Sequence, residues 1–208
     1  MLVQLFRLLA LVSCVSLVAC KEYKVREIKD FRLYVQSDDQ ELKAAIKELA
    51  DQFNKDVGGN ALTVVDSEDS SNSNISFVEN LKDENGSKLG LGQWRTTQTE
   101  KNKFKANGSE TEVVVVHSMN IEFDMNNFVG KISKISDKSS KEYKHLYHLF
   151  CHEVGHGMQL DHDANNVHSV MNPVVSYKSQ VSVDYDHFFG YVRSYMGVHS
   201  NAQIAEAL

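Results

Sequence analysis

The chain has 208 residues, which predicts one domain with a short appendage, because a domain typically spans roughly 150 residues. Hydrophobic residues make up 42% and charged residues 24%, a globular composition that excludes a disordered chain. The net charge of −6 argues against a nucleic-acid partner, and three cysteines are too few for a disulfide-stapled scaffold.

Residues 1–19 are predicted to be a secretion signal. They carry a single charged side chain, and their apolar run is too short to span a bilayer. The run ends in Leu17-Val18-Ala19-Cys20, which resembles the lipobox of bacterial lipoproteins. The resemblance implies a lipid anchor on Cys20, a tether over residues 20–30 and a place in the bacterial cell envelope, with Lys21 favouring the outer membrane. The alternative is an ordinary cleaved signal in which Cys20 has no role.

Hydrophobic periodicity predicts an α+β domain over residues 31–208. The segment 89–97, with glycines at 90 and 92, favours an exposed or edge strand. The β-branched run Val113–Val116 is typical of a strand buried on both faces. The remaining predicted strands are 31–35, 61–65, 75–78 and 121–123, and the predicted helices are 38 or 39 to 57, 143–158 and 183–195.

The segment from His152 to His162 carries the strongest chemical signal. On a helix, His152 and His156 are i and i+4, so both imidazoles project from one face and can share a metal ion. Glu153 lies about 100° further round the helix, where its carboxylate can act as a general base without being a ligand. If the helix ends near Gly157, the chain can turn back and bring in His162 as a third ligand. Three neutral imidazoles leave one tetrahedral position open, which is the arrangement of a catalytic zinc ion.

A second element, Ser169-Val170-Met171-Asn172-Pro173, lies downstream. A long zinc motif followed by a methionine turn is the metzincin signature. Within that clan the chain resembles a matrixin-type catalytic domain from about residue 31 to 197, with looser likeness over 61–65, 74–77 and 86–92.

The resemblance implies a metzincin-type zincin fold, with a twisted mixed β-sheet, a backing helix, an active-site helix and a C-terminal helix. It implies one catalytic Zn²⁺ bound by His152, His156 and His162, with Glu153 activating water and Met171 forming the apolar floor under the metal.

The resemblance also implies endopeptidase hydrolysis of proteins or peptides. The substrate would lie antiparallel to the strand near residues 88–95. We expect a monomer, anchored to a membrane through lipid and without a nucleic-acid partner. Calcium supports many matrixin domains, but the acidic loop 66–69 lacks a recognisable ligand spacing, so no calcium site is assigned.

Two positions depart from the matrixin pattern. Gln159 stands where the family usually has glycine in a left-handed turn, and Val175 stands where many relatives have tyrosine, with Tyr177 as no more than a neighbour of the site. These departures keep open a non-catalytic, surface-anchored binding protein with a structural or degenerate zinc site, although an intact Glu153 favours catalysis. His148, four residues before His152, is an alternative ligand on the same helix.

Overall fold

The computed structural model describes residues 22–84, 86–105, 108–174 and 182–197. The chain divides into two compact units, of which unit 1 comprises Met1–Ile28 and Thr97–Val116, and unit 2 comprises Lys29–Thr96 and His117–Leu208. Strands β7 (Gly90–Lys105) and β8 (Gly108–Asp124) contribute residues to both units. Within the described ranges, no helix has the length and apolar character needed to cross a membrane.

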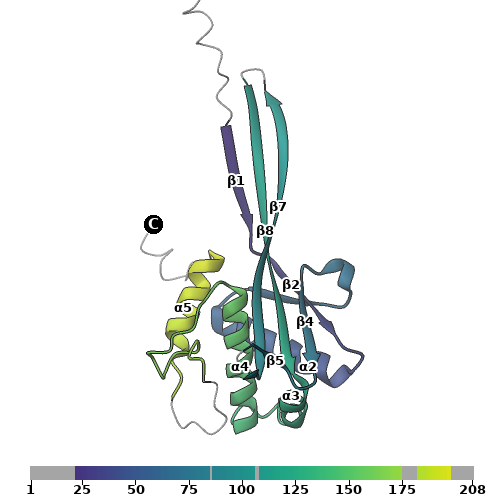
Figure 1. Ribbon diagram of the computed structural model, residues 1–208, viewed down its shortest axis with the longest axis vertical. Coiled ribbons are helices and arrows are strands. Elements are labelled where there is room, and N and C mark those ends of the chain that lie inside the picture. Colours follow the sequence, from purple (N-terminus) through teal and green to yellow (C-terminus); the bar gives the residue numbers. More distant parts are fainter. Residues whose placement is uncertain (1–21, 85, 106–107, 175–181, 198–208) are drawn as a thin grey trace, which may run out of the picture. The chain divides into compact units, whose positions relative to one another are not determined.

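The sheet of unit 2 is mixed, as expected. Its strands lie in the order β7-β8-β4-β2-β3, with β2 at Phe31–Gln36, β3 at Leu62–Val65 and β4 at Ser73–Val78 (Figure 1). The pairs β8–β4, β4–β2 and β2–β3 are parallel. Strand β7 runs in the opposite direction to β8 and forms one edge (Figure 1). The sheet is therefore mostly parallel with one antiparallel edge strand.

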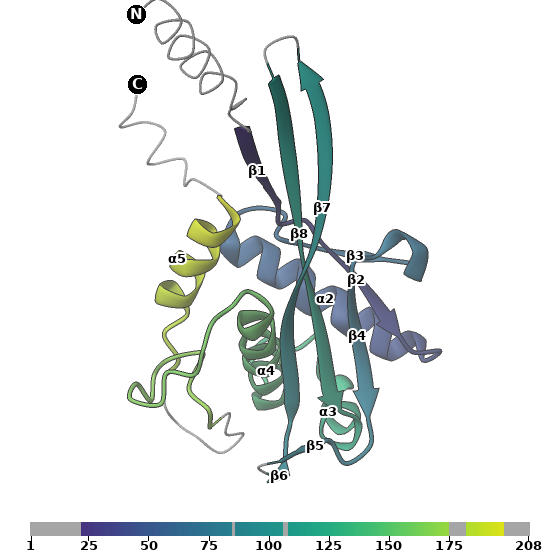
Figure 2. The same cartoon turned by 45° about the horizontal axis from the view of Figure 1, so that its top comes forward.

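Within the described part of the chain, four α-helices accompany the strands: α2 (Gln40–Val57), α3 (Met125–Ile132), α4 (Lys141–Gly157) and α5 (Tyr185–Met196). Figure 2 shows α2 behind the strands, and α2 packs against β3, α3, α4 and α5. The Asp39 side chain caps α2 by accepting hydrogen bonds from the backbone of Glu41 and Leu42, and Gly58 ends the helix at φ 82°. These are the boundaries that the sequence predicts for this helix.

Aromatic rings join the helices of unit 2 in one core. Phe53 of α2 meets Phe150 of α4 and Phe188 and Phe189 of α5 edge to face, with ring centroids 5.4–6.2 Å apart. Such pairs each contribute about 0.5–1.5 kcal/mol beyond the burial of their area. This core fixes α4, the helix that carries the metal motif, against α2 and α5.

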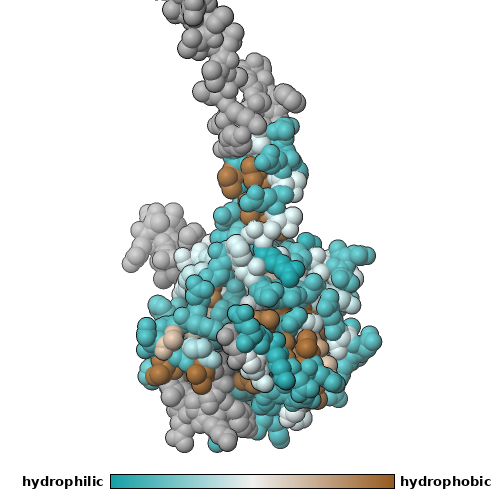
Figure 3. Space-filling model, viewed as in Figure 1, coloured by the Kyte–Doolittle hydropathy of each residue, from teal (hydrophilic) through white to brown (hydrophobic). Residues whose placement is uncertain are grey.

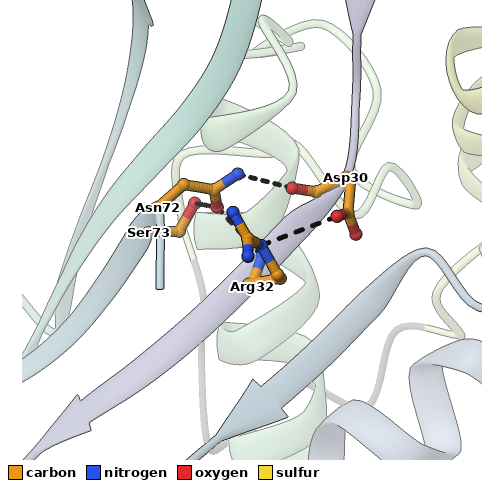
Figure 4. Close-up of polar contacts among 4 residues, drawn as sticks. All are labelled: Asp30, Arg32, Asn72 and Ser73. Atoms are coloured by element: carbon orange, nitrogen blue, oxygen red, sulfur yellow. Dashed lines mark hydrogen bonds and ion pairs between the residues drawn. The ribbon is translucent and has the colours of Figure 1, made fainter. Parts of the chain in front are cut away.

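Polar contacts fix the start of β4 beside β2. The Asn72 side chain accepts a hydrogen bond from the Arg32 backbone at 2.9 Å and donates one to the Asp30 carbonyl oxygen at 2.6 Å (Figure 4). Ser73 donates to the Asn72 side chain at 3.0 Å. One asparagine thus sets the register in which the two parallel strands begin.

Helix α3 and the short hairpin of β5 (Lys82–Asp83) and β6 (Gly86–Ser87) are not predicted from the sequence. The Asp124 side chain caps α3 by accepting from the Asn127 backbone at 2.9 Å, and only Phe128 and Ile132 are buried on it. Two buried residues give too weak a helical period to be recognised in a sequence.

Unit 1 differs from the expectation in two ways. Glu22–Ile28, expected within a tether, forms strand β1, which pairs in parallel with β8 from Glu110 to Val116. The run Val113–Val116 is only half-buried, so the expectation of a strand buried on both faces is wrong. The buried part of β8 lies in unit 2, at Met119, Ile121 and Phe123.

The surface drawn in Figure 3 is mostly hydrophilic, with small scattered groups of hydrophobic residues. Among the residues that the structure describes, the exposed large hydrophobic side chains are Val25, Val78, Trp94, Val129, Val167 and Val174. Single exposed residues of this kind are normal on a globular protein.

Candidate metal centre

Helix α4 places the first two histidines of the motif. Ser140 caps the helix by accepting a hydrogen bond from the Tyr143 backbone at 3.0 Å, and the helix ends at Gly157. Because His152 and His156 are one turn apart, their Nε2 atoms lie 3.2 Å from each other.

The turn after α4 brings in the third histidine. The Gln159 backbone donates to the His156 carbonyl at 3.0 Å, and the Leu160 backbone donates to the Gly155 carbonyl at 2.9 Å. These two bonds make a Schellman-type helix end, with Gln159 in the left-handed conformation at φ 69°. The expected left-handed residue is therefore present, at a cost of about 1 kcal/mol for a side chain other than glycine.

The three histidines converge on one point. The His162 Nε2 atom lies 3.2 Å from His156 Nε2, and one ligand atom from each of the three side chains falls within 4.8 Å of the others. Among the described residues, this is the one group of three or more side chains that could hold a metal ion.

Main-chain carbonyls set the tautomers of two of the rings. The Nδ1 atom of His152 lies 2.8 Å from the Val170 carbonyl oxygen, and that of His156 lies 2.7 Å from the Leu160 carbonyl oxygen. A carbonyl only accepts, so each Nδ1 carries the hydrogen and each Nε2 presents its lone pair to the centre.

This donor set fits a zinc ion. Two lone pairs 3.2 Å apart cannot hydrogen-bond to each other, so a cation between them satisfies both. Nitrogen ligands at the usual Zn–N distance of about 2.0–2.1 Å stand roughly 3.3 Å apart in a tetrahedral site. Burial also lowers the pKa of His152 to about 3 and lowers that of His156, which keeps both rings in the neutral form that binds metal.

Glu153 lies against the edge strand β7. Its side chain is only 4% exposed, and the Gly92 backbone N–H donates a hydrogen bond to its carboxylate. A Cβ atom at Gly90 would stand 2.5 Å from the Glu153 Oε1 atom, and one at Gly92 would stand 2.2 Å from the Glu153 carbonyl oxygen. The two glycines therefore allow β7 to lie directly on α4. Burial raises the Glu153 pKa to about 8, although the Gly92 bond and the charge of Lys88 oppose the rise.

Met171 packs directly under α4. A Cβ atom at Gly155 would stand 2.4 Å from the Met171 Sδ atom, so this glycine of the motif leaves room for the methionine. The Asp163 backbone donates to the Met171 carbonyl at 2.9 Å, which ties the methionine turn to the loop that carries His162. The adjacent Val170 carbonyl orients His152, so the same turn also holds a ligand.

The other histidines of interest lie outside the cluster. His148 points its Nε2 atom at the Val170 carbonyl at 3.2 Å, and His168 points its Nδ1 atom at the Ser182 carbonyl at 2.8 Å. The bonds that orient the ligands come from main-chain carbonyls, rather than from the neighbouring Asp161 or Asp163. A sequence does not reveal these carbonyls or the Gly92 N–H, because main-chain groups carry no residue-type signal.

Cys20, Val175 and Tyr177 lie outside the described residues. No protein-family model matches the chain, and a search of the curated proteins finds no match.

Proposed function

We propose that this chain is a zinc-dependent endopeptidase with a metzincin-type, matrixin-like fold. One observation carries the proposal: three imidazole Nε2 atoms converge in a metal-binding arrangement, and a buried carboxylate follows the first of them on the same helix. Three nitrogen ligands leave a fourth position of a tetrahedral zinc site open, as catalytic sites do and closed structural sites do not.

The arrangement of the elements supports the same proposal. The mixed sheet has a single antiparallel edge strand, α2 packs beside it, and α4 carries the metal motif. The turn containing Met171 returns under α4. Together these features correspond to the sheet, backing helix, active-site helix and methionine turn that the motif implies.

The chemistry divides between the metal and Glu153. A Zn²⁺ ion at the three histidines would act as a Lewis acid, polarising the scissile carbonyl and making water more acidic. The Glu153 carboxylate would accept a proton from the attacking water molecule and deliver it to the leaving amide nitrogen. The Gly92 N–H holds the carboxylate on the side of α4 that faces β7.

Strand β7 is the proposed site of substrate binding. As an edge strand it offers main-chain groups with which an extended peptide can pair, apart from the Gly92 N–H that is bonded to Glu153. Gly90 and Gly92 place this strand next to Glu153, so a peptide bound along β7 would lie close to the proposed base.

A second candidate is favoured by the burial of Glu153. Only 4% of Glu153 is exposed, which suits a non-catalytic, surface-anchored binding protein with a structural or degenerate zinc site. The two functions differ in whether Glu153 affects peptide cleavage.

The test compares the soluble chain from residue 21 with its Glu153→Ala and Glu153→Gln variants. Zinc content is measured together with the cleavage of casein, an unstructured protein. We expect one zinc ion per chain in all three proteins, and at least a hundredfold slower cleavage in both variants, since general-base catalysis contributes about 10²–10⁴. Zinc without cleavage in the wild type would favour the binding protein with a structural zinc ion. Absence of zinc would overturn the peptidase and leave the binding protein with a degenerate site.

We also propose that Cys20 is lipidated and that the mature protein is anchored in the bacterial cell envelope. The proposal rests on the Leu17-Val18-Ala19-Cys20 sequence alone. Protein or peptide substrates would then be those that reach the membrane surface.

A further inference from the structure

The left-handed turn at Gln159 is an unusual feature of the metal centre. Within the described ranges, Asn80 and Gln159 are the two residues other than glycine with positive φ. A glycine adopts this conformation freely, whereas glutamine is strained in it. The turn nevertheless positions two of the metal ligands. The Leu160 carbonyl orients the His156 ring, and the chain after the turn brings His162 next to His156.

Helix α5 contacts this turn through two tyrosines. The Tyr191 hydroxyl donates to the Met158 carbonyl at 3.1 Å, and the Gln159 Nε2 atom donates to the Tyr195 hydroxyl at 3.5 Å. The tyrosines are i and i+4 on α5, and their rings stack with centroids 6.0 Å apart. Each of the two residues that make the turn is therefore held by one tyrosine.

Tyr195 is itself fixed from several sides. Its hydroxyl lies 3.1 Å from Nδ1 of the buried His117 on β8, and the Lys29 ammonium stands 4.2 Å from its ring centroid. Phe31 of β2 stacks on the same ring at 6.4 Å. The Gln159 amide donates to the Tyr195 oxygen and also lies 3.5 Å from His117 Nδ1, the ring nitrogen that shares a hydrogen bond with the Tyr195 hydroxyl. The Gln159 side chain is thus hydrogen-bonded to a tyrosine hydroxyl whose position is fixed by its surroundings.

We propose that Gln159, Tyr191 and Tyr195, which we call the turn clamp, hold the left-handed turn and thereby position His156 and His162 for the metal. The inference rests on the zinc centre of the proposed function. A glycine at position 159 would adopt the left-handed conformation freely, whereas here side-chain contacts stabilise it. Because both tyrosines lie on α5, the metal affinity of this chain depends on that helix. Gln159 and the two tyrosines are positioning residues, since none of them is a member of the metal-binding cluster.

The first test compares Gln159→Ala with Gln159→Gly in the soluble chain from residue 21. Alanine keeps the strained φ and removes the amide, whereas glycine removes the amide and the strain together. We expect zinc affinity, measured by competition with a chelating dye, to fall about tenfold for Gln159→Ala, the usual scale for a group that orients a ligand. Gln159→Gly should stay within about threefold of the wild type because glycine needs no clamp.

The second test uses Tyr195→Phe in two backgrounds. The substitution should weaken zinc binding when residue 159 is glutamine and have no effect when it is glycine. The visible absorption spectrum of bound Co²⁺ reports ligand geometry directly, and it should change in Gln159→Ala and Tyr195→Phe but not in Gln159→Gly. Tyr34→Phe, on β2, is the matched control, and circular dichroism of each metal-free variant checks that it is folded.

Three outcomes would overturn the clamp. Wild-type affinity and spectrum in a folded Gln159→Ala variant would show that the amide does not position the ligands. An equal effect of Tyr195→Phe in both backgrounds would show that the tyrosine acts on stability alone. Absence of metal from the wild type would overturn the zinc centre and the clamp together, whereas either of the first two results would leave the zinc centre standing.

Discussion

His162 is the exposed member of the metal cluster, and it comes from a loop rather than from α4. His148 lies on the same helix as the other two ligands and is half-buried, but its Nε2 atom faces the Val170 carbonyl. From sequence spacing alone, either His148 or His162 could be the third ligand. The geometry separates them, because His162 belongs to the metal-binding group found among the described residues and His148 does not.

Alanine substitutions test this assignment. His162→Ala should weaken zinc binding at least a hundredfold, because a ligand is removed, whereas His148→Ala should weaken it by less than about tenfold. Both affinities are measured by dye competition, with a urea titration to confirm that each variant folds. The reverse order would identify His148 as the ligand.

The lowered pKa of the buried His145, near the start of α4, predicts how the free energy of unfolding depends on pH. Burial lowers its pKa from 6.5 to about 4, and the charges of Lys131 on α3 and of His148 act in the same direction. Between these two values the unfolded chain binds a proton that the folded chain does not, so the free energy of unfolding falls as the pH drops from about 6.5 to about 4. A shift of this size corresponds to about 3 kcal/mol at most.

We therefore expect the metal-free wild type to lose more stability between pH 7 and pH 4.5 than its His145→Gln variant. Urea unfolding of both proteins at the two pH values, with a chelator present, measures the difference. Parallel losses in the two proteins would show that His145 is protonated equally in the folded and unfolded chains.

At the scale of elements, the contact between β7 and α4 joins the proposed substrate strand to the proposed base. The short distance between β7 and α4 depends on Gly92. A Cβ atom at this position would stand 2.2 Å from the main-chain oxygen of Glu153, which cannot rotate away. Gly130 in α3 is the opposite case, because nothing lies within 4 Å of the corresponding Cβ position.

Alanine at these two glycines should have opposite effects. Gly92→Ala should lower the free energy of unfolding by about 2–3 kcal/mol through overpacking, and it should slow casein cleavage as β7 moves away from Glu153. Gly130→Ala should raise it by about 0.5–1 kcal/mol, because alanine is the better helix residue. Urea unfolding measures both, and a Gly92→Ala variant as stable as the wild type would contradict the close packing of β7 on α4.

At the scale of the whole molecule, the sequence best predicts those features that depend on local helix geometry. The i, i+4 spacing of His152 and His156 fixes their relation on any helix, and the glycines and caps around α2 fix its ends. The partners of the ligands are unpredictable because they are main-chain carbonyls of Val170 and Leu160, which any residue type could supply.

The sequence is least informative about strands whose formation and burial depend on pairing with a distant strand. The charged segment Glu22–Ile28 forms a strand because β8 pairs with it, and the run Val113–Val116, which pairs with this strand, is only half-buried. Strand propensity depends on such context more than helix propensity does. The extent of β7 and β8 is also longer than the predicted strands for this reason.

The division into two units leads to a prediction about β1. The three ligands, Glu153, Met171 and the turn clamp all belong to unit 2, whereas β1 pairs only with residues of unit 1. A chain that begins at Lys29 should therefore keep its zinc affinity within about twofold of the chain that begins at Lys21, because the removed residues belong to the unit that does not hold the site.

The same truncation should affect unit 1 directly. Without β1, the segment Glu110–Val116 loses its parallel partner and exposes unpaired main-chain groups. Trypsin should then cut after Lys101 faster than in the longer chain, because local opening costs less where fewer backbone hydrogen bonds are formed. A tenfold loss of zinc affinity on removing β1 would instead show that this strand supports the metal centre, and that the two units do not behave as separate parts.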